Sequence, residues 1–443
     1  MAIYYQIRRK LIVVCCAVLF LTAAVNIYAA DTIKLGVIGP LKLLQGQYIL
    51  DGTQLAVDEI NDAGGVMVKG QKYAIKIIKA DSNELLSIAD AVQAMERLIT
   101  ADNADFIIGG FSSEAGLAYQ EVVGDHKKIW LSPTFCDKIL TERIAKNYDK
   151  FKYHFRVGGP NTDFWGIMEA QQLMMVIDEV KRQLGVKKPR VAIIVEKTIF
   201  AGHVVDAMLK TPVTAEFEGV GKWIVSRMAS DVTAEMSAIK ASNPHIILTV
   251  TTGPVGVAIA KTWGGLQIPA ALIGVAVAAS VETTWKTTSG TCNYSATNDV
   301  IGRVEITQKT IPFHDKVVKK TGKRPLFIIT DSYDAIYILK TAIEKAGTIE
   351  TEAVLSELEK TDYVGPAGRI GFFPKGHETP HDLMWGPGRV TWVVLQWRDG
   401  ELVTVWPDGK GRLGDKGFEN LRYKGTVNYE LPPWMVKYWK AKK

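Results

Sequence analysis

A short segment at residues 109–115, Gly-Gly-Phe-Ser-Ser-Glu-Ala, contains the residues best suited to bind a ligand. Glycines at the end of a strand let the backbone approach a ligand closely, and the first turn of a helix offers free N–H groups and a positive dipole end. The segment therefore predicts an anion site, and a carboxylate would fit. The alternative is that Ser112 only caps the helix, and the local pattern leaves both interpretations open.

Two other motifs are similar to catalytic or cofactor-binding signatures, but their surroundings argue against both. Residues 377–381, His-Glu-Thr-Pro-His, match a zinc-protease pattern, yet Pro380 opposes the helical turn that would place both histidines on one face. Residues 409–414 match a dinucleotide-binding pattern, but no βαβ unit follows them. We therefore expect no enzyme activity, no metal and no cofactor.

The composition is that of an ordinary globular protein. The chain has 443 residues, of which 47% are apolar and 23% charged, enough for two or three domains. Disordered, collagen-like and coiled-coil classes are excluded. The formal net charge is +6, but residues 8–10 supply three of the positive charges, so no nucleic-acid partner is implied.

The N-terminus has the three parts of a secretory signal. Basic residues at 8–10 precede an apolar run at 11–25 and two small residues, Ala29 and Ala30. We expect cleavage near Ala30 and export to the periplasm or the extracytoplasmic face. An uncleaved N-terminal membrane anchor is the alternative, and it requires that Asn26 be tolerated within the span.

Two cysteines, Cys136 and Cys292, remain after removal of residues 1–30. In an exported chain they could form a disulfide. They could equally be two unpaired buried thiols, and the sequence does not decide between these.

Strand and helix patterns alternate from residue 32 onward. Strands are predicted at 33–39, 73–81, 105–110, 190–196 and 245–250. Apolar residues at helical spacing lie between them: Ile49, Thr53, Ala56 and Ile60; Ile88, Ala91, Met95 and Leu98; Ile167, Ala170, Met174 and Ile177. This alternation predicts an α/β protein with two lobes of parallel βαβ units, whose ligand contacts lie at the carboxyl ends of the strands.

Several stretches together resemble one known family. The sequence resembles the solute-binding proteins of branched-chain amino acid ABC importers, the type I periplasmic binding proteins. The matching stretches are IKLGVIGPL at 33–41, DGTQLAVDEIN at 51–61 with glycines at 64–65, LSP at 131–133, NP at 243–244, YDAIY at 333–337 and GPAG at 365–368.

The resemblance implies a two-lobed Venus-flytrap in which each lobe is a parallel-sheet, Rossmann-like sandwich and three crossovers join the lobes. By this analogy lobe 1 comprises residues 31–157 and 303–380, and lobe 2 comprises 158–302 and 381–408. Residues 409–443 would form a C-terminal extension.

In lobe 1, the resemblance places Ser113 on the hydroxyl that contacts a ligand carboxylate, with Phe111 and Ser112 beside it. Further family contacts fall on Thr134 and Cys136. A thiol is a much weaker hydrogen-bonding group than the threonine hydroxyl usual in the family, so the polar contact at this point is reduced.

In lobe 2, the residues depart further from the pattern for α-amino acids. Thr252 stands where a tyrosine is usual, and Ala276 where an acidic residue is usual. Without that acid, a ligand ammonium would be buried unpaired at a cost of several kcal/mol. Glu282 is the nearest acid that could replace it, and Phe200 occupies the place of a family aromatic residue.

Tyr48, in a shortened first loop, is a further candidate ligand contact. Together the site residues favour a carboxylate or amide with an apolar or aromatic body and no α-ammonium, while an ordinary aliphatic amino acid remains an alternative. The resemblance implies a monomeric binding protein that delivers a small molecule to a membrane permease. A ligand sensor for a receptor is the second function, and a metal hydrolase using His377 and His381 is the third.

Overall fold

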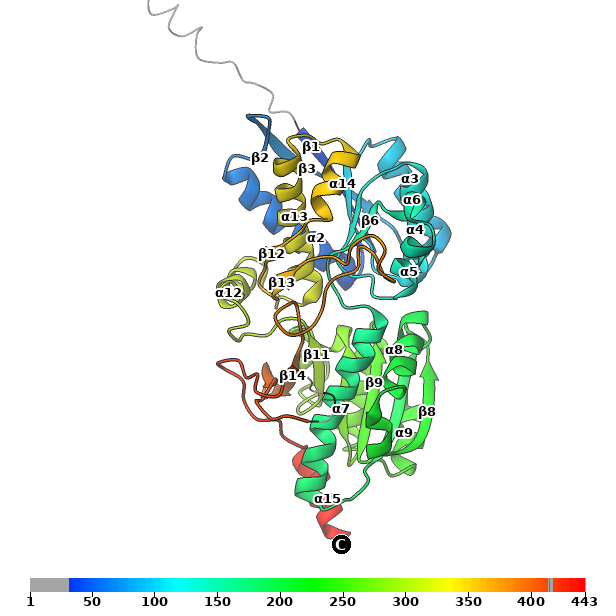
Figure 1. Ribbon diagram of the computed structural model, residues 1–443. Coiled ribbons are helices and arrows are strands. Elements are labelled where there is room, and N and C mark those ends of the chain that lie inside the picture. Colours follow the sequence, from blue (N-terminus) through cyan, green and yellow to red (C-terminus); the bar gives the residue numbers. More distant parts are fainter. Residues whose placement is uncertain (1–31, 413, 415–416, 443) are drawn as a thin grey trace, which may run out of the picture.

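Two α/β lobes lie one above the other in the computed structural model, which describes residues 32–412, 414 and 417–442 (Figure 1). Residues 1–30, the predicted export signal, lie outside the described residues. Among the residues that are described, no helix is both long and apolar enough to span a membrane.

The first lobe is built on a six-stranded sheet in the order β2-β3-β1-β4-β5-β6. All neighbouring strands run parallel except β2 and β3. The strands are β1 (Thr32–Gly39), β2 (Val66–Val68), β3 (Gln71–Asp81), β4 (Phe106–Gly109), β5 (Trp130–Ser132) and β6 (His154–Arg156).

Helices cover both faces of this sheet (Figure 1). They are α2 (Leu44–Asp62), α3 (Ile88–Thr100), α4 (Ser113–Asp125), α5 (Ile139–Lys146), α6 (Tyr148–Phe151), α13 (Phe327–Ala346) and α14 (Thr351–Leu358). The lobe also contains α12 (Thr310–Thr321), which lies to the side of the sheet and contacts α2 and α13 (Figure 1). Helices α2 and α13 pack closely although they are far apart in sequence. A Cβ atom at Gly52 would lie 2.3 Å from the carbonyl oxygen of Ile329, so only glycine permits this approach.

The second lobe contains a four-stranded parallel sheet in the order β10-β9-β7-β8. Its strands are β7 (Arg190–Glu196), β8 (Glu218–Val225), β9 (Ile246–Thr251) and β10 (Ala271–Ala276). Its helices are α7 (Thr162–Leu184), α8 (Ile199–Leu209), α9 (Thr233–Ala241), α10 (Val255–Gly265) and α11 (Thr283–Thr287), with 3₁₀ turns at Pro212–Glu216 and Val277–Ala279.

A second sheet in this lobe was not predicted from the sequence. It is antiparallel, in the order β11-β14-β15, with strands β11 (Ala296–Asp299), β14 (Val393–Arg398) and β15 (Glu401–Trp406). A two-stranded ribbon, β12 (Tyr363–Val364) with β13 (Arg369–Ile370), completes the strands of the described chain. The predicted α/β class and parallel lobes are thus confirmed, but the antiparallel sheet was missed.

The predicted helix near residue 167 is also confirmed, whereas its predicted buried face is only partly right. Ala170, Met174 and Ile177 are buried, but Ile167 is 38% exposed. Helix α7 packs against both α8 and β10. Because it is buried on more than one side, its buried residues do not follow one apolar stripe along the helix.

The chain passes between the lobes three times: after β6, between β11 and α12, and between β13 and β14. A buried ion pair fixes the first and third crossings to each other. Arg156 Nε lies 2.7 Å from Asp382 Oδ1, and neither side chain is exposed. Asp382 Oδ2 also accepts hydrogen bonds of 2.9 Å from Thr141 and from Asn161.

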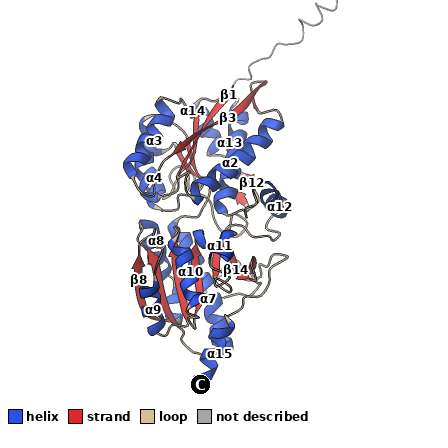
Figure 2. Cartoon of the chain, turned by 180° about the vertical axis from the view of Figure 1, so that it is seen from behind, coloured by secondary structure: helices blue, strands red, loops and turns tan. Residues whose placement is uncertain are grey.

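The C-terminal segment returns to the second lobe and ends in α15 (Pro433–Ala441), at its lower end in Figure 2. Trp434 packs 5.2 Å from Trp263 and donates its indole N–H to Ile268, and Trp439 stacks on His245. Cys136 and Cys292 are both free and buried, so the unpaired interpretation of the two cysteines is correct.

The crossing pair yields a stability prediction. Asp382→Ala leaves the Arg156 guanidinium buried without its counter-ion, so the free energy of unfolding should fall by about 3–5 kcal/mol. The exposed pair Arg303–Asp315 provides the control, because Asp315→Ala should cost less than about 1 kcal/mol. Urea unfolding of both variants measures the difference, and equal losses would contradict this role of Asp382.

Candidate ligand-binding site

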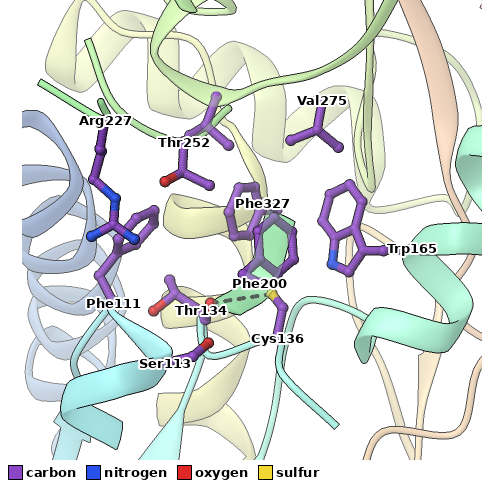
Figure 3. Close-up of a pocket in the computed structure, with 11 residues that line it drawn as sticks. Phe111, Ser113, Thr134, Cys136, Trp165, Phe200, Arg227, Thr252, Val275 and Phe327 are labelled. Atoms are coloured by element: carbon purple, nitrogen blue, oxygen red, sulfur yellow. Dashed lines mark hydrogen bonds between the residues drawn. The ribbon is translucent and has the colours of Figure 1, made fainter. Parts of the chain in front are cut away.

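A cavity lies between the two lobes (Figure 3). Residues from both lobes form its wall. They are Phe111, Ser113, Thr134, Cys136, Trp165, Phe200, Arg227, Thr252, Val275, Val277 and Phe327. Six of the nine residues predicted from the sequence are among them: Phe111, Ser113, Thr134, Cys136, Phe200 and Thr252.

The first lobe contributes the polar residues that follow β4 and β5. Ser113 is the first residue of α4, and its hydroxyl has no hydrogen bond within the described chain. Thr134 donates its hydroxyl hydrogen to the carbonyl of Gly110. The Cys136 thiol donates to the carbonyl of Thr134 at 3.2 Å, and burial raises its pKa to about 12, so it stays neutral.

An internal carboxylate already occupies part of the predicted anion site. Glu84 is buried and accepts the backbone N–H groups of Phe111 and Ser112, and its carboxylate also accepts the Tyr119 hydroxyl hydrogen at 2.7 Å. Burial raises the pKa of Glu84, and these hydrogen bonds partly offset that effect. The N–H groups of Phe111 and Ser112 are therefore used by the protein itself, and the anion site predicted at the start of α4 stays a prediction.

The second lobe has a corresponding carboxylate at the end of β7. Glu196 accepts the backbone N–H groups of Thr252 and Gly253 at 2.8 and 3.0 Å, and the Thr252 hydroxyl at 2.6 Å. These bonds fix the loop after β9. The Thr252 hydroxyl has already donated its hydrogen to Glu196, so it could only accept from a ligand.

Arg227 is the cation of the cavity, and it was not predicted from the sequence. It follows β8, and its Nε donates to Glu196 at 3.4 Å. Its Nη2 lies 3.9 Å from Glu114 of the first lobe, too long for a hydrogen bond. The terminal nitrogens of Arg227 therefore have donors to offer at the cavity (Figure 3).

Glu114 joins the lobes at the cavity rim. It accepts the Ser112 hydroxyl at 2.6 Å and the backbone N–H of Ile199, in the second lobe, at 3.2 Å. Burial alone would raise the pKa of Glu114, but these hydrogen bonds and the nearby Arg227 outweigh it and hold the pKa below its usual value. Glu114 is therefore ionised at neutral pH and occupied by protein donors.

Aromatic rings form most of the apolar wall. Trp165 and Phe200 meet edge to face with centroids 5.8 Å apart, and Trp165 and Phe327 are 6.4 Å apart. Phe200 and Phe327 lie across the middle of the cavity between Arg227 and Trp165 (Figure 3). Such a wall suits a flat apolar body.

Comparison with known proteins decides the family. A family model described as periplasmic binding protein matches residues 32–387. This chain belongs to the periplasmic binding protein family. The family consists of non-enzymatic solute-binding proteins of ABC transporters, and the chain is one of these.

Individual relatives of this binding protein are distant. Leu/Ile/Val-binding protein BraC3 of Rhizobium johnstonii is 24% identical, covering 84% of this chain and 94% of the relative. The isoleucine complex of the branched-chain amino acid binding protein LivJ from Streptococcus pneumoniae superposes with a TM-score of 0.68 and 19% identity, covering 84% and 98% of the two chains. A solute-binding protein of R. palustris in complex with benzoate has a TM-score of 0.70 and 14% identity, covering 84% and 95%. These structures show a shared fold.

Three predicted contacts lie off the cavity of this binding protein. Ser112 turns its hydroxyl to Glu114, as described above. Tyr48 is buried and donates its hydroxyl to Glu282 at 3.1 Å, so neither that tyrosine nor that acid lines the cavity. Ala276 lines a separate small pocket inside the second lobe, while its neighbours Val275 and Val277 line the cavity.

The residues missed in the sequence are Trp165, Arg227, Val275, Val277 and Phe327. Arg227 had a usable signal, since it follows a strand of the parallel sheet, and Val275 and Val277 lie at the end of another such strand. The strand before Arg227, β8, lies at the edge of the sheet and is mostly exposed. Its sequence therefore lacks the continuous apolar run that would predict a buried strand.

The histidine motif at 377–381 is not helical, as expected from Pro380. His377 contacts Thr379, and His381 is buried against Phe155 and Glu359. No group of three or more metal-ligating side chains occurs within the described ranges.

Behind the cavity wall lies a buried acid, Glu169 of α7. It accepts a 2.7 Å hydrogen bond from Asn298, and burial raises its pKa to about 8. Glu169 does not line the cavity. At neutral pH it is therefore mostly protonated, and it places no full negative charge beside a ligand.

The raised pKa of Glu169 makes stability depend on pH. Between about pH 4.5 and 8 the unfolded state loses the Glu169 proton while the folded state keeps it, so this group lowers the free energy of unfolding as pH rises. Glu169→Gln removes the effect. The stability of the variant relative to wild type should grow by about 1.4 kcal/mol per pH unit in this window.

Urea unfolding from pH 5 to 8 measures this trend. The exposed Glu218→Gln serves as the control and should show no such slope. A relative stability of Glu169→Gln that does not change with pH would contradict the assignment.

Proposed function

We propose that this periplasmic binding protein captures a small carboxylate that has an aromatic or apolar body and lacks an α-ammonium group, and delivers it to the membrane permease of an ABC importer. One observation carries the proposal: among the residues that the structure describes, four aromatic rings, one arginine and no carboxylate line the cavity between the lobes. We expect the protein to act as an exported monomer, outside the cytoplasm.

The hydrogen-bonding groups of the cavity favour an anionic ligand. In the described part of the chain, the Ser113 hydroxyl and the terminal nitrogens of Arg227 are donors without an acceptor at hydrogen-bonding distance. A carboxylate accepts from both kinds of donor and gains charge-assisted bonds with the guanidinium. An ammonium group needs acceptors instead, and the nearby Glu84, Glu114 and Glu196 are already bonded to protein donors.

The apolar body would lie between Phe200 and Phe327 and reach toward Trp165. Burying an aromatic ring there is worth a few kcal/mol. The benzoate complex of the R. palustris protein supports this choice at the level of the shared fold. The relatives named for leucine, isoleucine and valine support the competing amino acid, which the experiment below tests.

Ligand binding would favour the closed arrangement of the lobes. Several polar contacts already cross the cleft: Gln45 donates to the Thr252 carbonyl at 3.0 Å, and Asp137 pairs with His203 at 2.8 Å. A ligand that bridges Ser113 and Arg227 adds contacts that only the closed form can make. It therefore shifts the equilibrium toward the form presented to the permease.

Matched ligand pairs test the ligand class. Titration calorimetry on residues 31–443 compares 3-phenylpropanoate with phenylalanine, and 4-methylpentanoate with leucine. Each pair differs only in the α-ammonium group. We expect the acid without the ammonium to bind at least about 100-fold more tightly, because burying an unpaired ammonium costs several kcal/mol. Tighter binding of the amino acid in both pairs would overturn the proposal.

Ser113→Ala tests the carboxylate contact. Loss of this hydroxyl in a buried site should weaken binding of the acid by about 1–3 kcal/mol. The exposed Ser226→Ala is the matched control and should bind as wild type does. Unchanged affinity in Ser113→Ala, measured by calorimetry, would remove Ser113 from the ligand contacts.

A further inference from the structure

The indole N–H of Trp165 is an unused donor at the apolar end of the cavity. Trp165 lies in the first turn of α7 and is 1% exposed. Its Nε1 has no hydrogen-bond partner within the described chain. The indole nitrogen faces the Cys136 thiol, whose pKa the indole N–H acts to lower (Figure 3), but a thiol is only a weak acceptor.

Two other buried tryptophans of the second lobe, Trp385 and Trp392, also have an indole N–H without a partner among the described residues, but neither lines the cavity. Two more are satisfied. Trp263 donates its N–H to the carbonyl of Ala270 at 2.9 Å, and Trp397 donates to Ala279 at 3.0 Å. A buried N–H without an acceptor is destabilising. Because Trp165 lines the ligand cavity, a bound ligand can supply the acceptor that the protein does not.

The position of Trp165 defines which part of the ligand it would meet. Arg227, Phe111 and Ser113 lie on one side of the cavity and Trp165 and Val275 on the other, with Phe200 and Phe327 between them (Figure 3). A ring whose carboxylate faces Ser113 and Arg227 therefore turns its far edge toward the indole.

We propose that Trp165 is a specificity-determining residue that selects aromatic acids carrying an oxygen substituent on the ring at the end remote from the carboxylate. The substituent oxygen accepts the Nε1 hydrogen. If the substituent is a hydroxyl, its own hydrogen faces the Cys136 sulfur, which can accept weakly. This inference rests on the proposed function, because it takes the carboxylate end as fixed by Ser113 and Arg227.

A pair of acids of similar shape tests the inference on the unaltered protein. Calorimetry compares 4-hydroxybenzoate with 4-methylbenzoate, which differ in the hydroxyl and methyl group at the far edge of the ring. We expect 4-hydroxybenzoate to bind about 10-fold more tightly, because it satisfies the indole N–H. Equal binding of the two acids, or tighter binding of the methyl compound, would overturn the role of Trp165 while leaving the proposed function in place.

Trp165→Phe then assigns the preference to the indole. The ratio of the two dissociation constants should fall from about 10 to near 1 in this variant. Phe200→Leu is the matched control, since it alters a ring on the same wall without touching a donor. It should weaken both acids and keep the ratio. A ratio unchanged in Trp165→Phe would overturn the inference, and failure of both acids to bind the wild-type protein would overturn the proposed function with it.

Discussion

The carboxylates around the ligand cavity are occupied by the protein itself, and the rest of the site depends on this constraint. Glu84 accepts backbone N–H groups at the start of α4, Glu196 accepts those of the loop after β9, and Glu114 accepts across the lobes. Their lone pairs are directed at protein donors. What remains facing the cavity is a surplus of donors, from Ser113, Arg227 and Trp165, and such a surface selects a ligand rich in acceptors.

The same interactions couple recognition to the arrangement of the lobes. Glu114 belongs to the first lobe, yet it accepts from Ile199 and lies near Arg227 of the second. Arg227 is in turn held by Glu196. A ligand carboxylate at Ser113 and Arg227 would join a network of ionic contacts that already spans the cleft. The residues that bind the charge of the ligand would therefore also stabilise the closed arrangement of the lobes. The buried Arg156–Asp382 pair holds two of the crossings about which the lobes are connected.

The sequence could predict those site residues that directly follow buried strands. Ser113, Thr134 and Thr252 come at the carboxyl ends of β4, β5 and β9, where the rule for parallel sheets places ligand contacts. The prediction for β10 was wrong by one position: Val275 and Val277 line the cavity, and Ala276 between them does not. Successive side chains of a strand point to opposite faces of the sheet, so an error of one residue places the predicted contact on the wrong face. Glu84 could not be predicted, because its contact with α4 joins residues 28 positions apart through tertiary packing. Trp165 lies in the first turn of α7 and Phe327 begins α13, and the two residues meet only in the folded chain.

The most direct test of this account is the structure of the protein crystallised with an aromatic carboxylate. The account predicts closed lobes with the ring between Phe200 and Phe327. It also predicts that the ligand carboxylate lies within hydrogen-bonding distance of the Ser113 hydroxyl and the Arg227 guanidinium. The contradicting result is an amino acid in the cavity whose ammonium group displaces Arg227 and bonds to Glu114 or Glu196, because it would show that these carboxylates serve the ligand instead of the protein.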